Sequence, residues 1–213
     1  MLTLFDYLPS RNAWKVRQLL SHLRQPYLTK IVSIFEGEGS TEGYRRINPT
    51  GSVPAIEFDD GRVLAESNAI LGFLAEGTPY LPDDAFARAK VHQWLSFEQQ
   101  YVEMTIGSLR FWALTGKLPR RTAQMIDARR SGGLKALQVL DTELRMRPYI
   151  VGDRYSIADI ALFAYASCAE DADLALRPYS RVRAWIARVQ EQPGHLPGIH
   201  PYSIDPHSSR ELH

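Results

Sequence analysis

The apolar and polar positions of this chain follow two different rhythms. Up to about residue 76, short β-rich runs alternate with stretches whose apolar residues recur at i, i+3, i+4 and i+7, as on one face of a helix. Strands are expected at residues 2–6, 29–35, 53–58 and 62–65, the last two joined by the turn Asp59-Asp60-Gly61. Helices are expected from Ser10 to the break at Gln25-Pro26, over residues 41–47, and from Ser67. This order predicts an α/β unit, a sheet covered by helices.

Beyond residue 84 the pattern contains helical spacing only. Residues 78–84 have the composition of a linker, so we expect one domain over residues 1–77 and a second over residues 85–213. The second domain is predicted to be all-helical. Its helices are expected at residues 85–113, 122–145, 156–168 and 180–190, with a weak point at Gly132-Gly133.

One helix start in the second half is marked by its capping residues. In Ser156-Ile157-Ala158-Asp159, the Ser156 hydroxyl can accept a hydrogen bond from the backbone three residues on, and Asp159 can reach back to the Ser156 amide. An N-cap contributes roughly 0.5–2 kcal/mol to stability. Ser156 and Asp159 are therefore interpreted as folding residues rather than catalytic ones.

Composition argues against several classes of function. The 25 basic and 24 acidic residues give a net charge of +1 with no basic stripe, which argues against a nucleic-acid partner. No apolar run is long enough to span a membrane, and the first residues lack the features of a signal peptide. The single cysteine, Cys168, excludes an intrachain disulfide, and the six histidines show no ligand spacing. We therefore expect a cytoplasmic protein without a metal.

Five segments carry a resemblance to a known family. They are DYLPSRNAWKVR at residues 6–17, NPTGSVPAI at 48–56, LAESNAI at 64–70, QWLSFEQ at 93–99 and GDRYSIAD at 152–159. In this order and spacing they resemble cytosolic glutathione S-transferases, in particular bacterial members with a serine-type thiol site. The resemblance covers nearly the whole chain. It implies a thioredoxin-like N-terminal domain, a C-terminal helical bundle, glutathione as co-substrate, and a homodimer with the helix over residues 85–113 near the interface.

Two positions depart from the family pattern. Ser52 stands where the family often has a Lys or Arg that helps to hold a glutathione carboxylate. Arg11 replaces the usual small residue between Ser10 and Asn12. The first departure bears on glutathione affinity and the second on the shape of the pocket.

Ser10 is the first candidate for contact with the glutathione sulfur. The nucleophile is the thiolate, and a thiol with a pKa of about 8.5 is ionised to only a few per cent at pH 7. A helix N-terminus favours an anion, and a hydrogen bond to a charged group contributes roughly 1.5–3 kcal/mol, so Ser10 could lower the pKa by roughly one to two units. Spacing alone favours a simple N-cap for Ser10, whereas the resemblance favours thiol contact.

Asn12 and Tyr7 are alternatives at the same place. Asn12 could donate its amide to the sulfur or serve only as a polar first-turn residue. Other transferase classes use a tyrosine near the end of the first strand, but Tyr7 lies too early for the serine-type alignment and is expected in the core or a pocket wall. Lys15 is expected to be a solvated helix residue.

Two further segments are implied to bind the rest of glutathione. Val53 and Pro54, after Ser52, would pair through their backbone with the cysteinyl part, as in strand addition. The resemblance alone predicts a cis bond there, because only about 5–6% of X–Pro bonds are cis. At the next helix start, Ser67 would bind the γ-glutamyl carboxylate and Glu66 its ammonium. Without the resemblance, Ser67 would be an N-cap with an acidic neighbour.

The implied function is transfer of glutathione to a small hydrophobic electrophile, as in detoxification. Candidates for the electrophile pocket are Tyr7, Leu8, Phe111 and Trp112, the last two placed between the domains by the resemblance. Core packing is the commoner fate of such side chains. Two alternatives stay open: a glutathione-dependent disulfide reductase, which needs no protein cysteine, and a non-catalytic partner-binding protein of the same fold.

Overall fold

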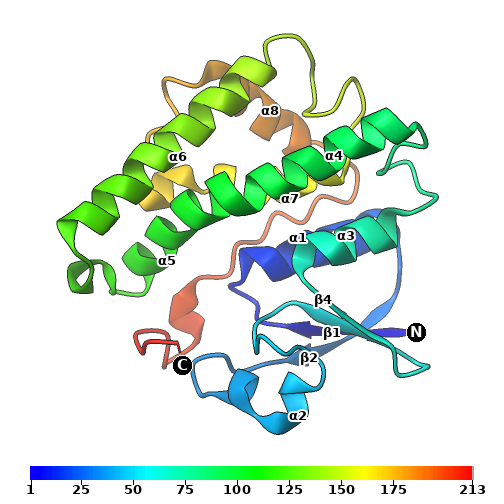
Figure 1. The fold of residues 1–213 in the computed structure, drawn as a ribbon, viewed down its shortest axis with the longest axis vertical. Helices are drawn as coiled ribbons and strands as arrows, with labels where there is room; N and C mark the ends of the chain where they lie inside the picture. Colours follow the sequence, from blue (N-terminus) through cyan, green and yellow to red (C-terminus); the bar gives the residue numbers. More distant parts are fainter. Residues whose placement is uncertain (213) are drawn as a thin grey trace. The chain divides into compact units, whose positions relative to one another are not determined.

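The computed structural model describes residues 1–212, which fall into two compact units (Figure 1). One unit comprises residues 1–75 together with the segment that begins at Pro193, and the other comprises residues 76–192. The first unit holds a four-stranded mixed sheet with helices, and the second is helical. The predicted fold class, a thioredoxin-like domain followed by a helical domain, is confirmed. Residue 213, at the end of the predicted second domain, lies outside the described residues.

The sheet has the strand order β2–β1–β3–β4. β1 (Leu2–Asp6) pairs in parallel with β2 (Tyr27–Ile31) and antiparallel with β3 (Ala55–Phe58), which forms the predicted hairpin with β4 (Val63–Ala65). All four predicted strands are present, so the alternating segments of the sequence located the sheet correctly.

The second strand starts and ends earlier than the predicted range 29–35. Val32 still donates to the Asp6 carbonyl at 2.8 Å, but the chain turns at Ser33. There the Glu38 carboxylate accepts the Ser33 N–H at 2.8 Å, and the Ser33 carbonyl accepts the Glu36 N–H at 3.2 Å. Because these local bonds satisfy the backbone, residues 33–35 leave the ladder despite their β-rich composition.

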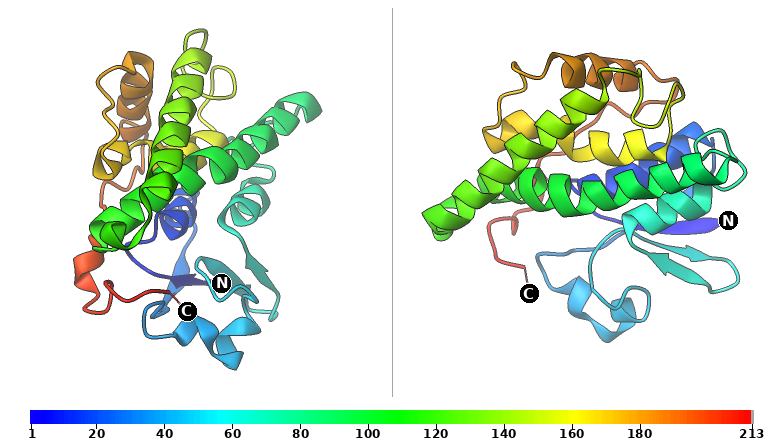
Figure 2. Two further views of the ribbon diagram at one scale, coloured as in Figure 1. Left: turned by 60° about the vertical axis from the view of Figure 1, so that its left-hand side comes forward. Right: turned by 45° about the horizontal axis from the view of Figure 1, so that its top comes forward.

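Helices cover both faces of the sheet. α1 (Arg11–His22) and α3 (Ser67–Ala75) lie against one face, and the short α2 (Glu42–Arg45) lies on the other (Figures 1 and 2). Alternate side chains of β1 point to opposite faces and divide the core in two. One cluster contains Leu2, Leu4, Val16, Leu20, Ile56 and Ile70. The other contains Phe5, Val32, Tyr44 and Ala55.

The segment after Pro193 packs along α1. Gln18 holds it at two points, accepting the Leu196 N–H at 2.7 Å and donating to the Gly194 carbonyl at 3.1 Å. Trp14 Nε1 donates to the Leu196 carbonyl at 3.2 Å. This differs from the predicted boundary, which assigned the tail to the helical domain. The tail is held by side chain to backbone bonds, which leave no periodic pattern in the sequence.

The second unit consists of helices and turns. The α-helices are α4 (Ala85–Phe97), α5 (Ser108–Leu114), α6 (Ala123–Glu143), α7 (Ile157–Ala166) and α8 (Ser180–Gln190), with a π-helical segment at Glu98–Gly107. None of the helices within residues 1–212 is long and apolar enough to cross a membrane.

The prediction of one continuous α-helix over residues 85–113 was wrong in its hydrogen-bond pattern. The chain keeps its helical direction, but the pattern widens to the π form over Glu98–Gly107. The apolar stripe that led to the prediction is nevertheless buried, including Val102, Ile106 and Leu109. Side-chain periodicity therefore located the buried face, but it did not distinguish an α from a π pattern of backbone bonds.

The glycine pair in α6 does not interrupt the helix as a weak point would. A Cβ on Gly132 would lie 2.7 Å from Thr105 Cγ2, and one on Gly133 would lie 2.6 Å from Leu174 Cδ1. Both distances are too short for real contacts, so the two glycines permit close packing against the π-helical segment and Leu174.

The predicted cap of α7 is confirmed. Ser156 is the N-cap residue, and its backbone N–H donates to Asp159 Oδ2 at 3.0 Å. Asp159 also accepts from Trp185 Nε1 and from the Ile150 N–H, both at 2.9 Å. The carboxylate thus joins the start of α7 to α8 and to the preceding loop, which is a wider structural role than a local cap.

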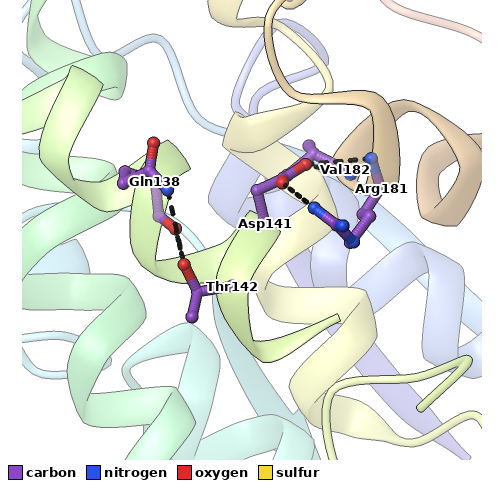
Figure 3. Close-up of polar contacts among 5 residues, drawn as sticks. All are labelled: Gln138, Asp141, Thr142, Arg181 and Val182. Atoms are coloured by element: carbon purple, nitrogen blue, oxygen red, sulfur yellow. Dashed lines mark hydrogen bonds and ion pairs between the residues drawn. The ribbon is translucent and has the colours of Figure 1, made fainter. Parts of the chain in front are cut away.

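Asp141 of α6 caps the start of α8 (Figure 3). Its Oδ1 accepts the N–H groups of Arg181 at 2.9 Å and Val182 at 3.3 Å, and its Oδ2 accepts from the Arg181 guanidinium at 2.9 Å. The first turn of a helix has N–H groups without partners in the helix itself. Asp141 supplies the acceptor from a neighbouring helix.

Asp141→Ala is expected to lower the free energy of unfolding by about 1–2 kcal/mol, because two first-turn N–H groups lose their acceptor. Urea unfolding measures the change. Asp141→Asn, which keeps an acceptor oxygen, is expected to cost less. Thr142→Ala is the matched control, since it removes only exposed hydrogen bonds with Gln138 on the same helix (Figure 3). An equal loss in the Ala and Asn variants would contradict the capping role.

Candidate functional site

Ser10 closes the turn between β1 and α1. Its N–H donates to the Tyr7 carbonyl at 2.8 Å, and its hydroxyl oxygen accepts the Ala13 N–H at 3.2 Å. Ser10 is therefore the N-cap of α1, as its spacing alone indicated. A hydroxyl has one proton and two lone pairs, so accepting from Ala13 leaves its proton available to a further acceptor. The capping role and contact with a thiolate are compatible.

A buried ion pair fixes this turn. Arg17 Nη1 lies 2.5 and 2.7 Å from the two carboxylate oxygens of Asp6, the last residue of β1. Arg17 Nη2 donates to the Leu8 carbonyl, inside the turn, at 3.0 Å. Asp6 is fully buried and Arg17 is 9% exposed. The guanidinium thus ties the end of the strand and the turn to the second turn of α1, which fixes where Ser10 lies.

The start of α3 contacts the first turns of α1. Ser67 Oγ lies 3.4 Å from Asn12 Oδ1 and 3.4 Å from Lys15 Nζ. The expectation that Lys15 is solvated was wrong, because Lys15 is fully buried. It lies on the side of α1 that faces α3, where its ammonium can donate to the Ser67 hydroxyl. The two helix N-termini that carry Ser10 and Ser67 are therefore neighbours.

The register of the sheet brings the proline corner to the same place. Ala55 pairs with Phe5 of β1 and with Ala65 of β4. One residue further along, Pro54 is therefore level with Asp6 on one side and Glu66 on the other. The Val53–Pro54 peptide bond is cis, as the resemblance implied. The end of β1, the cis-proline and the start of α3 thus meet at one end of the sheet.

The loop before the proline is rigidly built. The buried Asn48 donates to the Ser52 carbonyl at 2.7 Å and accepts from the Thr50 N–H at 3.1 Å. Gly51 has a φ of 72°, and a Cβ on Gly39 would overlap its carbonyl oxygen. Only glycine permits this close approach of two backbones. The loop therefore presents Ser52 and Val53 in a fixed position, with the Ser52 side chain exposed.

Glu66 has an unusual backbone conformation. Its φ is 68°, a region that residues other than glycine rarely adopt, and its side chain is exposed. Its carbonyl accepts the Ile70 N–H at 2.9 Å and so begins α3. Such backbone outliers cluster at binding sites. The strained residue stands directly before Ser67, at the corner described above.

A pocket of about 230 Å³ opens beside the turn that carries Ser10. All its walls belong to the first unit: Tyr7, Leu8, Pro9, Ile31, Ser33, Glu36, Ile204, Asp205 and Pro206. The Tyr7 hydroxyl donates to Asp205 Oδ2 at 3.1 Å. Burial and the Asp205 carboxylate raise the pKa of Tyr7 far above its ordinary value. The Tyr7 proton is thus held by Asp205, which leaves Ser10 as the better donor to a sulfur.

Comparisons with known proteins agree with this geometry. Residues 9–76 match the family described as glutathione S-transferase, N-terminal domain, and residues 100–193 match glutathione S-transferase, C-terminal domain. A solved glutathione S-transferase from Pseudomonas fluorescens Pf-5 is 39% identical, with a TM-score of 0.89 over 92% of this chain and 98% of that chain. This chain belongs to the glutathione S-transferase family.

Two more distant relatives bear on ligand and reaction. A glutathione transferase from Burkholderia graminis, solved with two glutathione molecules bound per subunit, is 29% identical with a TM-score of 0.80, covering 91% of this chain and 85% of that one. A disulfide-bond oxidoreductase of Escherichia coli (strain K12) is 27% identical over 194 residues, 88% of this chain and 89% of its own length.

In this chain, the four residues assigned from the sequence to the electrophile pocket are divided between the two units. Tyr7 and Leu8 line the pocket of the first unit. Phe111 and Trp112 lie in α5 of the second unit and are partly exposed. Cations cover both rings: Lys117 Nζ lies 4.4 Å from the centre of the Phe111 ring, and the Arg121 guanidinium lies 5.2 Å from that of Trp112.

Sequence reasoning missed several residues of the candidate site. The pocket walls Glu36 and Asp205 had no distinguishing pattern, since one lies in a loop and the other in the tail. Asp6 and Arg17 did carry a signal in the sequence. An acidic residue ends the predicted strand, and a basic residue lies in the second turn of the helix that follows. Within residues 1–212, no three His, Cys, Asp or Glu side chains cluster as a metal site requires.

Proposed function

We propose that this chain is a glutathione transferase in which the thiolate of bound glutathione attacks a small hydrophobic electrophile. The observation that carries the proposal is the meeting of Ser10, Pro54 and Ser67 at one end of the sheet. Two helix N-termini and the backbone at the cis-proline corner, within reach of one tripeptide, suit its thiolate, its carboxylate and its backbone. The Burkholderia relative solved with glutathione supports the same ligand.

Each proposed contact follows from the local structure. The Ser10 hydroxyl and Asn12 face the sulfur, and the N-terminus of α1 adds partial positive charge. The backbone of Val53, presented by the loop around Ser52, pairs with the cysteinyl part of glutathione. Ser67 binds the γ-glutamyl carboxylate, and the buried Lys15 beside it adds positive charge in a region where Ser52 supplies none.

The reaction forms a bond between the glutathione sulfur and an electrophilic carbon. The thiol proton passes to solvent, the sulfur supplies the electron pair of the new bond, and in a substitution the leaving group departs with the pair of the broken bond. The protein contributes by keeping the thiol ionised at neutral pH. Leu8 and Pro9 of the pocket stand directly before Ser10, so an electrophile held there lies next to the proposed sulfur site.

A second candidate is a glutathione-dependent disulfide reductase. It is favoured by the similarity to the E. coli disulfide-bond oxidoreductase over nearly the full length of both chains. In that reaction the same thiolate would attack a disulfide sulfur, so the binding site would be unchanged. The proposal further includes a homodimer and a cytoplasmic setting, the latter favoured by the single cysteine, Cys168.

The protein is expected to be retained on immobilised glutathione and to be eluted by free glutathione. Ser67→Ala is expected to weaken equilibrium binding about tenfold, the effect of losing one hydrogen bond to a carboxylate. Ser40→Ala, an exposed serine of the same unit, is the matched control. Absence of binding at millimolar glutathione would favour a partner-binding protein without this activity. Assays of an aryl halide and a mixed disulfide side by side separate the two enzymatic candidates.

A further inference from the structure

We infer that the pocket beside Ser10 selects neutral or cationic electrophiles and rejects anionic ones, through the carboxylates of Glu36 and Asp205. The inference rests on the proposed function, because it concerns the electrophile that meets the glutathione thiolate. Its new element is the C-terminal tail: Asp205, Ile204 and Pro206 complete a pocket whose other walls come from the β1–α1 turn, β2 and the loop that follows it.

The two carboxylates are held in place around the pocket. Asp205 Oδ2 accepts the Tyr7 hydroxyl at 3.1 Å, and Asp205 Oδ1 accepts the His207 N–H at 2.8 Å. Glu36 Oε2 accepts the Ser33 hydroxyl at 2.8 Å, and its Oε1 lies 2.9 Å from His207 Nε2. The partners of Asp205 are neutral donors, which fix the carboxylate without cancelling its charge.

The remaining walls do not offset this charge. Of the nine wall residues, five are apolar, Tyr7 and Ser33 are neutral, and none is Lys or Arg. An anionic group entering the pocket would lose part of its hydration and meet two carboxylates, that of Asp205 with neutral donors and that of Glu36 beside His207. At a partly exposed site, two like charges about 4 Å apart repel strongly enough to change an equilibrium tenfold or more. A neutral ring or a cation has no such cost.

The tail is anchored independently of its pocket residues. Its contacts with Gln18 and Trp14 of α1 hold residues 194–196, and the ring of Tyr202 lies 6.3 Å from that of Tyr7. Asp205 is therefore presented by a segment that stays attached when its carboxylate is changed. This permits a test in which charge is removed while the wall remains.

The test compares glutathione-dependent turnover of 1-chloro-2,4-dinitrobenzene with that of its anionic counterpart, 4-chloro-3,5-dinitrobenzoate. Each kcat/KM is divided by the uncatalysed rate constant, and the ratio of neutral to anionic substrate is the selectivity. The double variant Glu36→Gln, Asp205→Asn is expected to lower this selectivity about tenfold, mainly by improving use of the anion. Glu42→Gln removes an exposed carboxylate of the same unit away from the pocket and is expected to keep the wild-type selectivity.

Two further measurements keep the outcomes distinct. Glu36 is at the surface, so Glu36→Gln alone is expected to fold normally and to give part of the shift should the double variant unfold. Equilibrium binding of the two S-aryl glutathione conjugates reports the same selectivity where turnover is slow. Unchanged selectivity in both variants would overturn the inference while leaving the transferase intact. Failure of the wild type to bind glutathione at all would instead remove the proposed function.

Discussion

Ser10→Ala is expected to raise the pKa of the bound glutathione thiol by about one to two units and to lower kcat/KM at pH 7 about tenfold or more. The Ser10 hydroxyl accepts from Ala13 and keeps its proton for the sulfur, while Tyr7, the other hydroxyl of this turn, donates to Asp205. Losing that donor returns the thiol toward its free pKa of about 8.5, where only a few per cent is ionised at pH 7. Glutathione binding should change little, because in the proposed complex Val53 and Ser67 contact other parts of the molecule.

Ultraviolet absorbance of the bound thiolate, titrated against pH, measures the pKa directly. Ser10→Ala also removes an N-cap and so costs about 0.5–2 kcal/mol of stability, whereas Ser10→Gly costs only a few tenths. Equal loss of activity in the two variants would therefore assign the effect to the hydroxyl and not to the cap. Asn12→Ala, made in parallel, is expected to give a smaller shift. A thiol pKa that is the same in wild type and Ser10→Ala would remove Ser10 from the mechanism.

The fold was predictable because most elements carry a local signal. α8 begins and ends at the predicted residues, since Val182, Trp185 and Val189 lie on one buried face. The hairpin between β3 and β4 follows from Gly61, which has a φ of 80°. The errors occur where the deciding contacts are distant or concern backbone bonds alone, as in the π-helical segment Glu98–Gly107.

The residues of the candidate site also fall into those with a local sequence signal and those placed by distant contacts. Sequence spacing located Ser10 and Ser67 at helix starts, and the resemblance to a family proposed these two residues and Pro54 as glutathione contacts. Asp205 was not found, because it meets Tyr7 across 198 residues and lies in a segment without periodicity. Lys15 was misjudged because a charged residue is normally exposed, and its burial depends on how α1 and α3 pack.

One buried carboxylate joins three segments of the helical unit. Asp159 is fully buried and accepts four hydrogen bonds, from the Ile150 N–H, the Trp185 ring N–H, and both the N–H and the hydroxyl of Ser156. These donors come from a loop, from α8 and from the start of α7. Replacing the carboxylate leaves buried N–H groups in three segments without an acceptor, and each such group costs about 1–3 kcal/mol.

Asp159→Ala is therefore expected to lower the free energy of unfolding by about 3–5 kcal/mol, measured by urea denaturation. Ser156→Ala, which removes one donor and leaves the carboxylate, is the control and is expected to cost about 1 kcal/mol. Comparable losses in the two variants would reduce Asp159 to a local cap.

The unfolding free energy lost in Asp159→Ala is expected to depend on pH in a definite direction. Burial raises the pKa of Asp159 from 3.8 to about 6, against the opposing effect of its hydrogen bonds. The folded chain thus holds the proton more tightly than the unfolded chain does. The resulting stabilisation is complete below about pH 4 and is lost as the pH rises through 6. Asp159→Ala cannot show this dependence, so the difference in unfolding free energy between wild type and variant should grow as the pH falls from 7 to 5. A difference that shrinks over this range would mean that the folded state favours the ionised carboxylate, with the four hydrogen bonds outweighing the cost of burial.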